Sequence, residues 1–186
     1  MEISEVFSKA EAKMSKAAEV LERELLGLRT GRASPALVEN IRADYYGLPT
    51  PIKELASIAV PEAHLLLIQP WDRNALSAIE KAILKSELGI TPSNDGNVIR
   101  LVVPQLTEER RRDLVKLVRK RVEEGKVAIR NVRREALEKI RLAEKEKEIS
   151  EDEARRFQDK LQKLTDGFIE DVDRLGRNKE AEIMEL

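Results

Sequence analysis

The chain has 186 residues, of which 37% are charged and 3% aromatic, and its net charge at pH 7 is -1. This length fits one large domain or two small ones, and the composition suits long solvated helices better than an all-β fold. The near-zero net charge excludes a global field that attracts nucleic acid or membranes, and the absence of cysteine excludes disulfides, thiolate metal sites and cysteine nucleophiles.

The first 28 residues carry a helical pattern. Apolar residues recur at spacings of three and four, which places them along one face of a helix. They are Ile3, Phe7, Ala10, Met14, Ala17, Leu21, Leu25 and Leu28. The N-terminus resembles neither a secretory signal nor a transit peptide, and no stretch reaches the roughly 18 apolar residues of a membrane span. We therefore expect a cytoplasmic protein with no membrane partner.

Between residues 41 and 103 the pattern changes to that of a small α/β module. Short apolar or alternating runs predict strands, one longer run predicts a helix, and prolines and glycines mark the turns. The predicted strands cover 41–46, 57–60, 65–69 and 98–103, and the predicted helix covers 75–88 with Asp72 or Asn74 as its cap. Residues 47–51 are turn or edge material, and residues 93–96 are a predicted turn.

Two further helices follow the module. Apolar residues at spacings of three and four run from Leu114 to Ala143 without a proline, so residues 107–149 predict one helix about 60 Å long. Ser150-Glu151-Asp152-Glu153 is a capping box that begins the next helix. Since each of the three helices has an apolar stripe, the stripes can bury one another in a bundle.

The predicted fold is therefore α+β. A three-helix bundle of residues 1–30 and 105–186 holds an inserted small domain of residues 31–104. The chain crosses between these parts twice, and two short crossings predict a hinge between an anchoring bundle and a movable domain. The hinge residues are Arg29, Thr30, Gly31, Arg32, Ala33 and Ser34 in the first crossing and Pro104 and Gln105 in the second. A bundle that satisfies its own stripes is expected to be monomeric.

Basic side chains form a second stripe on the predicted 107–149 helix. At about 100° per residue they fall in one sector of the helical wheel, apart from the apolar sector, so they point outward. The stripe consists of Arg112, Lys116, Arg119, Lys126, Arg130, Arg133, Arg134 and Arg141, with Glu123 as its main acidic interruption. Guanidinium groups along one line suit a phosphate backbone, and a solvated face with glutamate partners is the alternative. From Arg130 to Arg134 there is no acid before Glu135, which argues against that alternative.

Five other residues near the crossings and in the module have two interpretations each. Arg29 and Arg32 could form a second phosphate contact. Alternatively, Arg29 caps the C-terminus of the first helix and Arg32 is a solvated loop residue. Tyr45, Tyr46 and Trp71 are candidate stacking surfaces for bases. We expect Tyr45 and Trp71 to pack in the core and Tyr46 to be exposed.

Sequence patterns typical of enzymes are absent. His64 is the only histidine, and neither a Gly-x-Ser-x-Gly turn nor a Gly-rich phosphate loop accompanies it. No histidine spacing typical of metal ligands occurs, and the carboxylates lie beside lysines and arginines, where surface ion pairs are the default. We expect no catalytic residue, no metal and no cofactor.

Several segments together resemble the ribosome recycling factor family. The resemblance covers essentially the whole chain, in order. The segments are Arg29-Thr30-Gly31-Arg32-Ala33-Ser34-Pro35, Tyr45-Tyr46-Gly47, Thr50-Pro51, Ile79-Glu80-Lys81-Ala82-Ile83, Leu106-Thr107-Glu108-Glu109-Arg110-Arg111, Val127-Ala128-Ile129-Arg130-Asn131-Val132-Arg133-Arg134, Lys147-Glu148-Ile149-Ser150-Glu151-Asp152 and Gln162-Lys163-Leu164-Thr165-Asp166.

The resemblance implies an L-shaped protein whose long arm is the bundle and whose short arm is a β/α/β sandwich domain on two hinge strands. It implies a factor that is not an enzyme and that binds the ribosome after translation termination, near the aminoacyl site, through large-subunit ribosomal RNA. With elongation factor G and GTP hydrolysis by that factor, it would help to split the subunits. From the residues alone, a coiled-coil scaffold with an α/β protein-binding head is the alternative.

The resemblance also carries individual site residues. The family's RNA-contacting arginines match Arg130, Arg133 and Arg134, and its hinge motif matches residues 29–35. Three further expected contacts rest on the helical wheel alone, and these are Arg112, Arg119 and Lys126.

Overall fold

The computed structural model describes residues 2–185 and divides into two compact units. One unit combines the residues up to Leu28 with those from Glu108 onward, and the other is Arg29–Thr107. The first unit is a long helical bundle and the second is a small domain of antiparallel sheets with one α-helix. The predicted α+β class is confirmed.

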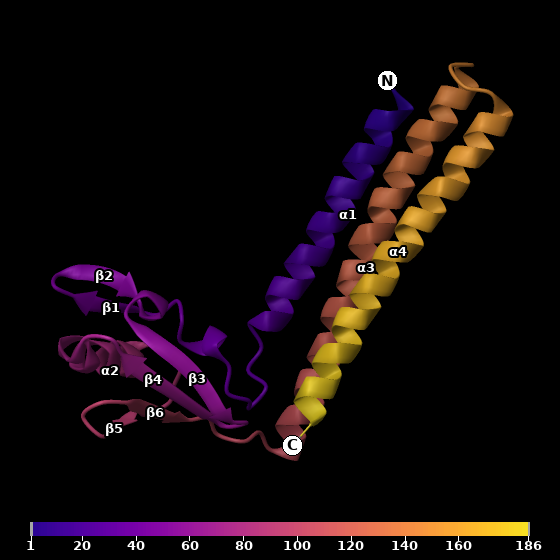
Figure 1. The fold of residues 1–186 in the computed structure, drawn as a ribbon. Helices are drawn as coiled ribbons and strands as arrows, with labels where there is room; N and C mark the ends of the chain where they lie inside the picture. Colours follow the sequence, from indigo (N-terminus) through magenta and orange to yellow (C-terminus); the bar gives the residue numbers. More distant parts are fainter. Residues whose placement is uncertain (1, 186) are drawn as a thin grey trace. The chain divides into compact units, whose positions relative to one another are not determined.

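Three helices make up the first unit: α1 (Ile3–Leu26), α3 (Glu108–Lys145) and α4 (Glu151–Met184). Each packs against the other two, and Figure 1 shows them running side by side over most of their length. Their apolar stripes meet in the core because residues three and four apart share one helix face. The core includes Phe7, Met14, Leu21, Leu25, Leu114, Val118, Ile129, Ile140, Leu161, Val172 and Ile183.

The connection between α3 and α4 is a tight turn. Lys147 has a φ of 60°, and the backbone N–H of Glu148 donates to the carbonyl of Ala143 at 2.9 Å, which is the pattern of an α-helix that ends in a residue with left-handed backbone conformation. The predicted helix at 107–149 therefore ends at Lys145, four residues early. The predicted capping box is confirmed, since Ser150 Oγ accepts from the N–H of Glu153 and Glu153 Oε2 accepts from the N–H of Ser150.

The second unit contains two sheets and the helix α2 (Leu76–Lys85). One sheet is a hairpin of β1 (Arg42–Tyr45) and β2 (Leu48–Pro51). The other has the strand order β3-β4-β6-β5 and is antiparallel throughout. Its strands are β3 (Ala56–Glu62), β4 (Leu65–Pro70), β5 (Ser93–Asn94) and β6 (Ile99–Val102).

One core joins these elements. The helix α2 packs against β1 and buries Ile79 and Ile83 in the same cluster as Leu66 and Ile99 of the four-stranded sheet. The unit is thus layered as hairpin, helix and sheet. Before α2, the side chain of Asp72 accepts from the N–H of Asn74 at 2.9 Å, so Asp72 caps the short helical turn Arg73–Ala75 that leads into α2.

Residues 47–51, predicted as turn or edge material, contribute a strand. A two-residue turn joins β1 to β2, because Tyr46 and Gly47 have φ values of 50° and 84°, the conformation that matches the twist of a hairpin. The side chain of Asp44 accepts from the N–H of Gly47 at 2.8 Å.

The aromatic residues divide differently from the prediction. Tyr45 is half-buried as expected, and its hydroxyl donates to Asp72 Oδ2 at 2.8 Å. This hydrogen bond raises the pKa of Tyr45. Tyr46 is 74% exposed, as expected. The core placement of Trp71 is wrong, since its side chain is 69% exposed: β4 ends at Pro70, so Trp71 lies beyond the alternation that turns Leu66 and Ile68 inward.

Candidate nucleic-acid interface

The basic stripe predicted on the long helix lies on α3, and the structure separates it into two rows. One row consists of Arg119, Lys126 and Arg133, which follow one another at intervals of seven residues and reach across to α4. The other row, which we call the outer row, makes no hydrogen bond or ion pair with α4 within residues 2–185. It consists of Arg112, Lys116, Arg130, Arg134 and Arg141, all of them exposed.

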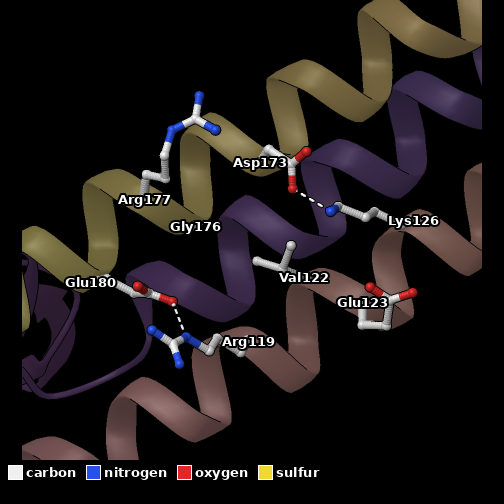
Figure 2. A pocket seen from close by; sticks show the side chains of 8 residues that line it. All are labelled: Arg119, Val122, Glu123, Lys126, Asp173, Gly176, Arg177 and Glu180. Carbon is white, nitrogen blue, oxygen red and sulfur yellow. Dashed lines mark hydrogen bonds and ion pairs between the residues drawn. The ribbon is translucent and has the colours of Figure 1, made fainter.

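The row beside α4 is engaged in contacts between the two helices. Arg119 Nε donates to Glu180 Oε1 at 2.9 Å, and Lys126 forms an ion pair with Asp173. Figure 2 shows both pairs bridging α3 and α4, with Arg177 directed away from them. The side chain of Lys126 is largely covered, with only 19% of it exposed.

These ion pairs border a groove of about 230 Å³ above the close contact of Val122 and Gly176. Its rim carries three cations and three carboxylates, so it has no net charge. They are Arg119, Lys126, Arg177, Glu123, Asp173 and Glu180. A phosphate group in this groove could reach Arg119 or Lys126 only by displacing the carboxylate that each one binds. These two expected contacts therefore serve the packing of α3 on α4, and they are weaker candidates for RNA than the outer row.

The outer row retains more available charge. Within residues 2–185, Lys116, Arg134 and Arg141 make no hydrogen bond or ion pair. Arg130 Nη1 contacts Glu123 Oε1 at 3.3 Å, and Arg112 pairs with Glu108 one turn away. Both pairs are solvent-exposed, and such pairs contribute little energy and are readily exchanged for a phosphate.

The acid closest in sequence to these arginines is held on another side of the helix. Glu135 accepts from Lys13 of α1 at 3.1 Å and lies 3.5 Å from Lys139. The Lys13 ammonium group lowers the pKa of Glu135, so the carboxylate stays ionised toward α1. As a result, Glu135 does not neutralise Arg134.

Arg133 is half-buried and fixed in orientation. Its Nη1 donates to Gln162 Oε1 of α4 at 2.9 Å, and Gln162 in turn donates to Asp166 at 2.8 Å. The Arg133 Nε is buried and has no hydrogen-bond partner within residues 2–185. A guanidinium held in this way presents its remaining donors in a defined plane, as bidentate phosphate recognition requires.

Arg29 is not the C-cap of α1, and its guanidinium is engaged within the second unit. Its guanidinium donates to the carbonyl of Leu88 at 2.7 Å and also to that of Glu87. It is therefore occupied at the C-terminal side of α2, while Gly27 occupies the C-cap of α1. Arg32 is half-buried. The single histidine, His64, contacts the carbonyl of Gly31.

Residues 2–185 contain neither a candidate metal site nor a membrane-spanning helix. No group of three or more side chains in this range is arranged to hold a metal ion. None of the helices in the same range has both the length and the apolar character needed to cross a bilayer.

Comparison with known proteins places the chain in a family. A family model described as ribosome recycling factor matches residues 21–184. The ribosome-recycling factor of Dehalococcoides mccartyi strain CBDB1 is 56% identical over 184 residues, which are 99% of this chain and 100% of the relative. The chain belongs to the ribosome recycling factor family. The ribosome-recycling factor of Roseiflexus sp. strain RS-1 is 58% identical over the same share of each chain.

Two solved structures extend the match to ribosome recycling factors in three dimensions. A solution structure of the ribosome recycling factor has a TM-score of 0.82 and 52% identity and covers 100% of this chain and 99% of its own. The second has a TM-score of 0.69 and 49% identity and covers 100% of both chains. It describes the T. thermophilus ribosome recycling factor and the E. coli elongation factor G bound to the E. coli post-termination complex.

Family membership confirms the resemblance found in the sequence motifs. It assigns the chain to ribosome recycling in translation and to ribosome binding, in preference to the coiled-coil scaffold alternative. Sequence reasoning missed the commitment of Arg119 and Lys126 to α4. The only available signal was the spacing of Asp173 and Glu180 by seven residues, which matches the spacing of Lys126 and Arg119 in an antiparallel helix pair.

Proposed function

We propose that the chain binds the post-termination ribosome near the aminoacyl site, through phosphate contacts from α3 to large-subunit ribosomal RNA. Elongation factor G, with GTP hydrolysis by that factor, then acts with it to split the ribosome into subunits. The chain itself is a cytoplasmic monomer that binds no cofactor and catalyses no reaction. The related factor described with elongation factor G on a post-termination complex supports this proposal.

One observation carries the RNA contact. The outer row of α3 keeps Arg134 and Arg141 without an internal partner in residues 2–185, and it holds Arg130 only in an exposed ion pair. Phosphate contacts need cations that stay charged and are not already neutralised. The principal proposed contacts are therefore Arg130 and Arg134 of the outer row, with Arg112 at its start. Arg133 of the row beside α4 joins them, because its partner Gln162 is neutral and leaves its charge available. Arg119 and Lys126 would contribute only if RNA displaced Glu180 and Asp173.

Ribosome co-sedimentation at several salt concentrations tests this proposal. Arg130→Ala and Arg134→Ala should each weaken binding, and the slope of log affinity against log salt should fall by about one for each phosphate that is no longer bound. The melting temperature should stay nearly unchanged, because both side chains are exposed.

A matched control is Arg155→Ala. Arg155 is an exposed arginine in the first turns of α4 that pairs with Glu151, so its removal changes the net charge equally. Binding should be unaffected in this variant. Equal weakening by Arg134→Ala and Arg155→Ala would indicate a general charge effect, and unaltered binding by the double variant of Arg130 and Arg134 would refute the proposed interface.

A further inference from the structure

The turn between β3 and β4 binds both chain segments that enter and leave the second unit. The N–H of Ala33 donates to the carbonyl of Ala63 at 2.7 Å, and the N–H of Val103 donates to the carbonyl of His64 at 2.7 Å. Two adjacent residues of one turn therefore hold the incoming and the outgoing segment together.

The side chain of His64 adds a third bond at the same place. Its Nδ1 lies 2.6 Å from the carbonyl oxygen of Gly31. A carbonyl oxygen can only accept, so the bond requires the proton on Nδ1. We call these residues, Gly31, Ala33, Ala63, His64 and Val103, the His64 clamp.

Packing between the two segments reinforces the clamp. Gly31 has a φ of 77°, and a Cβ atom at this position would lie 3.0 Å from Leu106 Cγ and 3.2 Å from the Leu106 backbone nitrogen. A side chain is thus excluded both by the conformation and by the neighbouring segment. On the incoming side, the bonds of Arg29 to the carbonyls of Glu87 and Leu88 tie a further residue to the second unit.

We propose that His64 is a positioning residue that fixes residues 31–33 and 103–104 to the second unit, so that bending between the units occurs outside the clamp. Because Arg29 and Leu106 also contact the second unit, the bending peptides then lie on the bundle side of these contacts, at 27–29 and 106–108. This moves the bending peptides from the hinge expected at 29–34 and 104–105 toward the helices of the bundle. The inference concerns bonds inside the second unit and does not depend on the proposed RNA contact.

Amide hydrogen exchange followed by NMR tests the clamp directly. In the wild-type chain, the amides of Ala33 and Val103 should be protected to a similar degree as those of the β4–β6 ladder. Exchange as fast as that of exposed loop amides would overturn the proposal. The long-range nitrogen spectrum of the imidazole should show the proton on Nδ1, and an Nε2-protonated tautomer would also overturn it.

Two substitutions separate the hydrogen bond from the bulk of the side chain. His64→Leu should speed exchange at Ala33 by about two- to tenfold, the effect of one net hydrogen bond. His64→Asn places an amide N–H near the position of Nδ1 and should restore most of the protection. Unchanged exchange in His64→Leu would refute the role of the imidazole. His64→Leu could also lose protection throughout the second unit because the unit unfolds. In that case the tautomer of the wild-type imidazole tests the proposal, and a proton on Nε2 would refute it.

A reversible crosslink tests where bending matters. Because the chain has no cysteine, Ala33→Cys with Ala63→Cys introduces a single pair across the clamp. Subunit splitting should be equal in the oxidised and reduced forms, since the clamp moves as one body. Activity that disappears on oxidation and returns on reduction would place the hinge inside the clamp. A wild-type chain that fails to split ribosomes would contradict the proposed function and leave the exchange result standing.

Discussion

Gly176 lies where α4 packs tightly against Val122 of α3. A Cβ atom at this position would lie 2.6 Å from Val122 Cγ2, and Val122 is β-branched and therefore stiff. Gly167, two and a half turns earlier on α4, faces open space, because a Cβ atom there would meet no heavy atom of another residue within 4 Å. Close packing against α3 therefore requires glycine at position 176, whereas no packing contact requires it at position 167.

We predict opposite effects of alanine at these two positions. Gly176→Ala should lower the free energy of unfolding by about 1–3 kcal/mol, because an inserted methyl group overpacks the interface between the helices. Gly167→Ala should raise it by about 0.5–1 kcal/mol, because alanine loses less backbone entropy in a helix. Urea unfolding of both variants measures the difference, and a stabilising Gly176→Ala would contradict the close packing.

Residue types and spacing predicted the chemistry of the basic stripe but not which charges are available. Arg119 and Arg134 are both arginines outside the apolar sector of one helix, yet Arg119 contacts Glu180 and Arg134 has no partner in residues 2–185. The difference comes from the acids of α4 across the seam, which a helical wheel of α3 does not contain. Trp71 was misplaced for a similar reason, since the end of β4 decides its exposure.

At the scale of elements, the capping box of α4 makes the helix start sensitive to acid. The backbone N–H of Ser150 hydrogen-bonds the Glu153 carboxylate and lowers its pKa below the ordinary value of 4.5. A carboxyl group with a lowered pKa in the folded state stabilises the fold above its unfolded pKa, and this contribution is lost as the pH falls through the folded value.

The prediction concerns Glu153→Gln, which keeps a side-chain acceptor but cannot titrate. At pH 7 the wild-type chain should have the higher urea midpoint, because its charged carboxylate binds the N–H more strongly. Below about pH 4 the difference should shrink as the wild-type carboxyl is protonated. Asp152→Asn removes a carboxylate from the same turn without touching the capping box and should differ less from wild type at pH 7. If the difference in urea midpoint between wild type and Glu153→Gln did not change with pH, the stabilising role of the ionised Glu153 carboxylate would be refuted.

Helix starts were easier to predict than helix ends. The residue types at Ser150 and Glu153 predict the two hydrogen bonds of a capping box, so the first residue of α4 was predicted correctly. The end of α3 depends on Lys147 adopting a left-handed backbone conformation. Glycine is the usual residue in this conformation, so a lysine in the sequence does not predict it. The strand β2 lies in residues that the sequence left open as turn or edge material, because Tyr46-Gly47 is not one of the usual hairpin dipeptides.

At the scale of the whole molecule, each unit has a core of its own. Ile79 is fully buried in the core of the second unit, and Met14 is fully buried in the bundle. The α+β class and the insertion of a module between helices followed from the change of apolar period alone, because a period of two and a period of 3.6 predict different elements.

We predict that core substitutions act locally. Ile79→Ala should destabilise the second unit by about 2–5 kcal/mol and accelerate amide exchange there, while the bundle amides exchange as in wild type. Met14→Ala should give the reverse pattern and serves as the reciprocal control. Equal acceleration in both units by either variant would show that they unfold as one cooperative body.

The side-by-side course of the segments at Gly31 and Leu106 also has a consequence for biosynthesis. The second unit is complete once Thr107 has been made, so it can fold while the rest of the chain is still on the translating ribosome. Helix α1 must wait for α3 and α4, its partners in the bundle. Until then its apolar stripe is uncovered. Each new copy of this chain therefore passes through a stage in which the nascent α1 exposes apolar surface, and such surface is prone to aggregation.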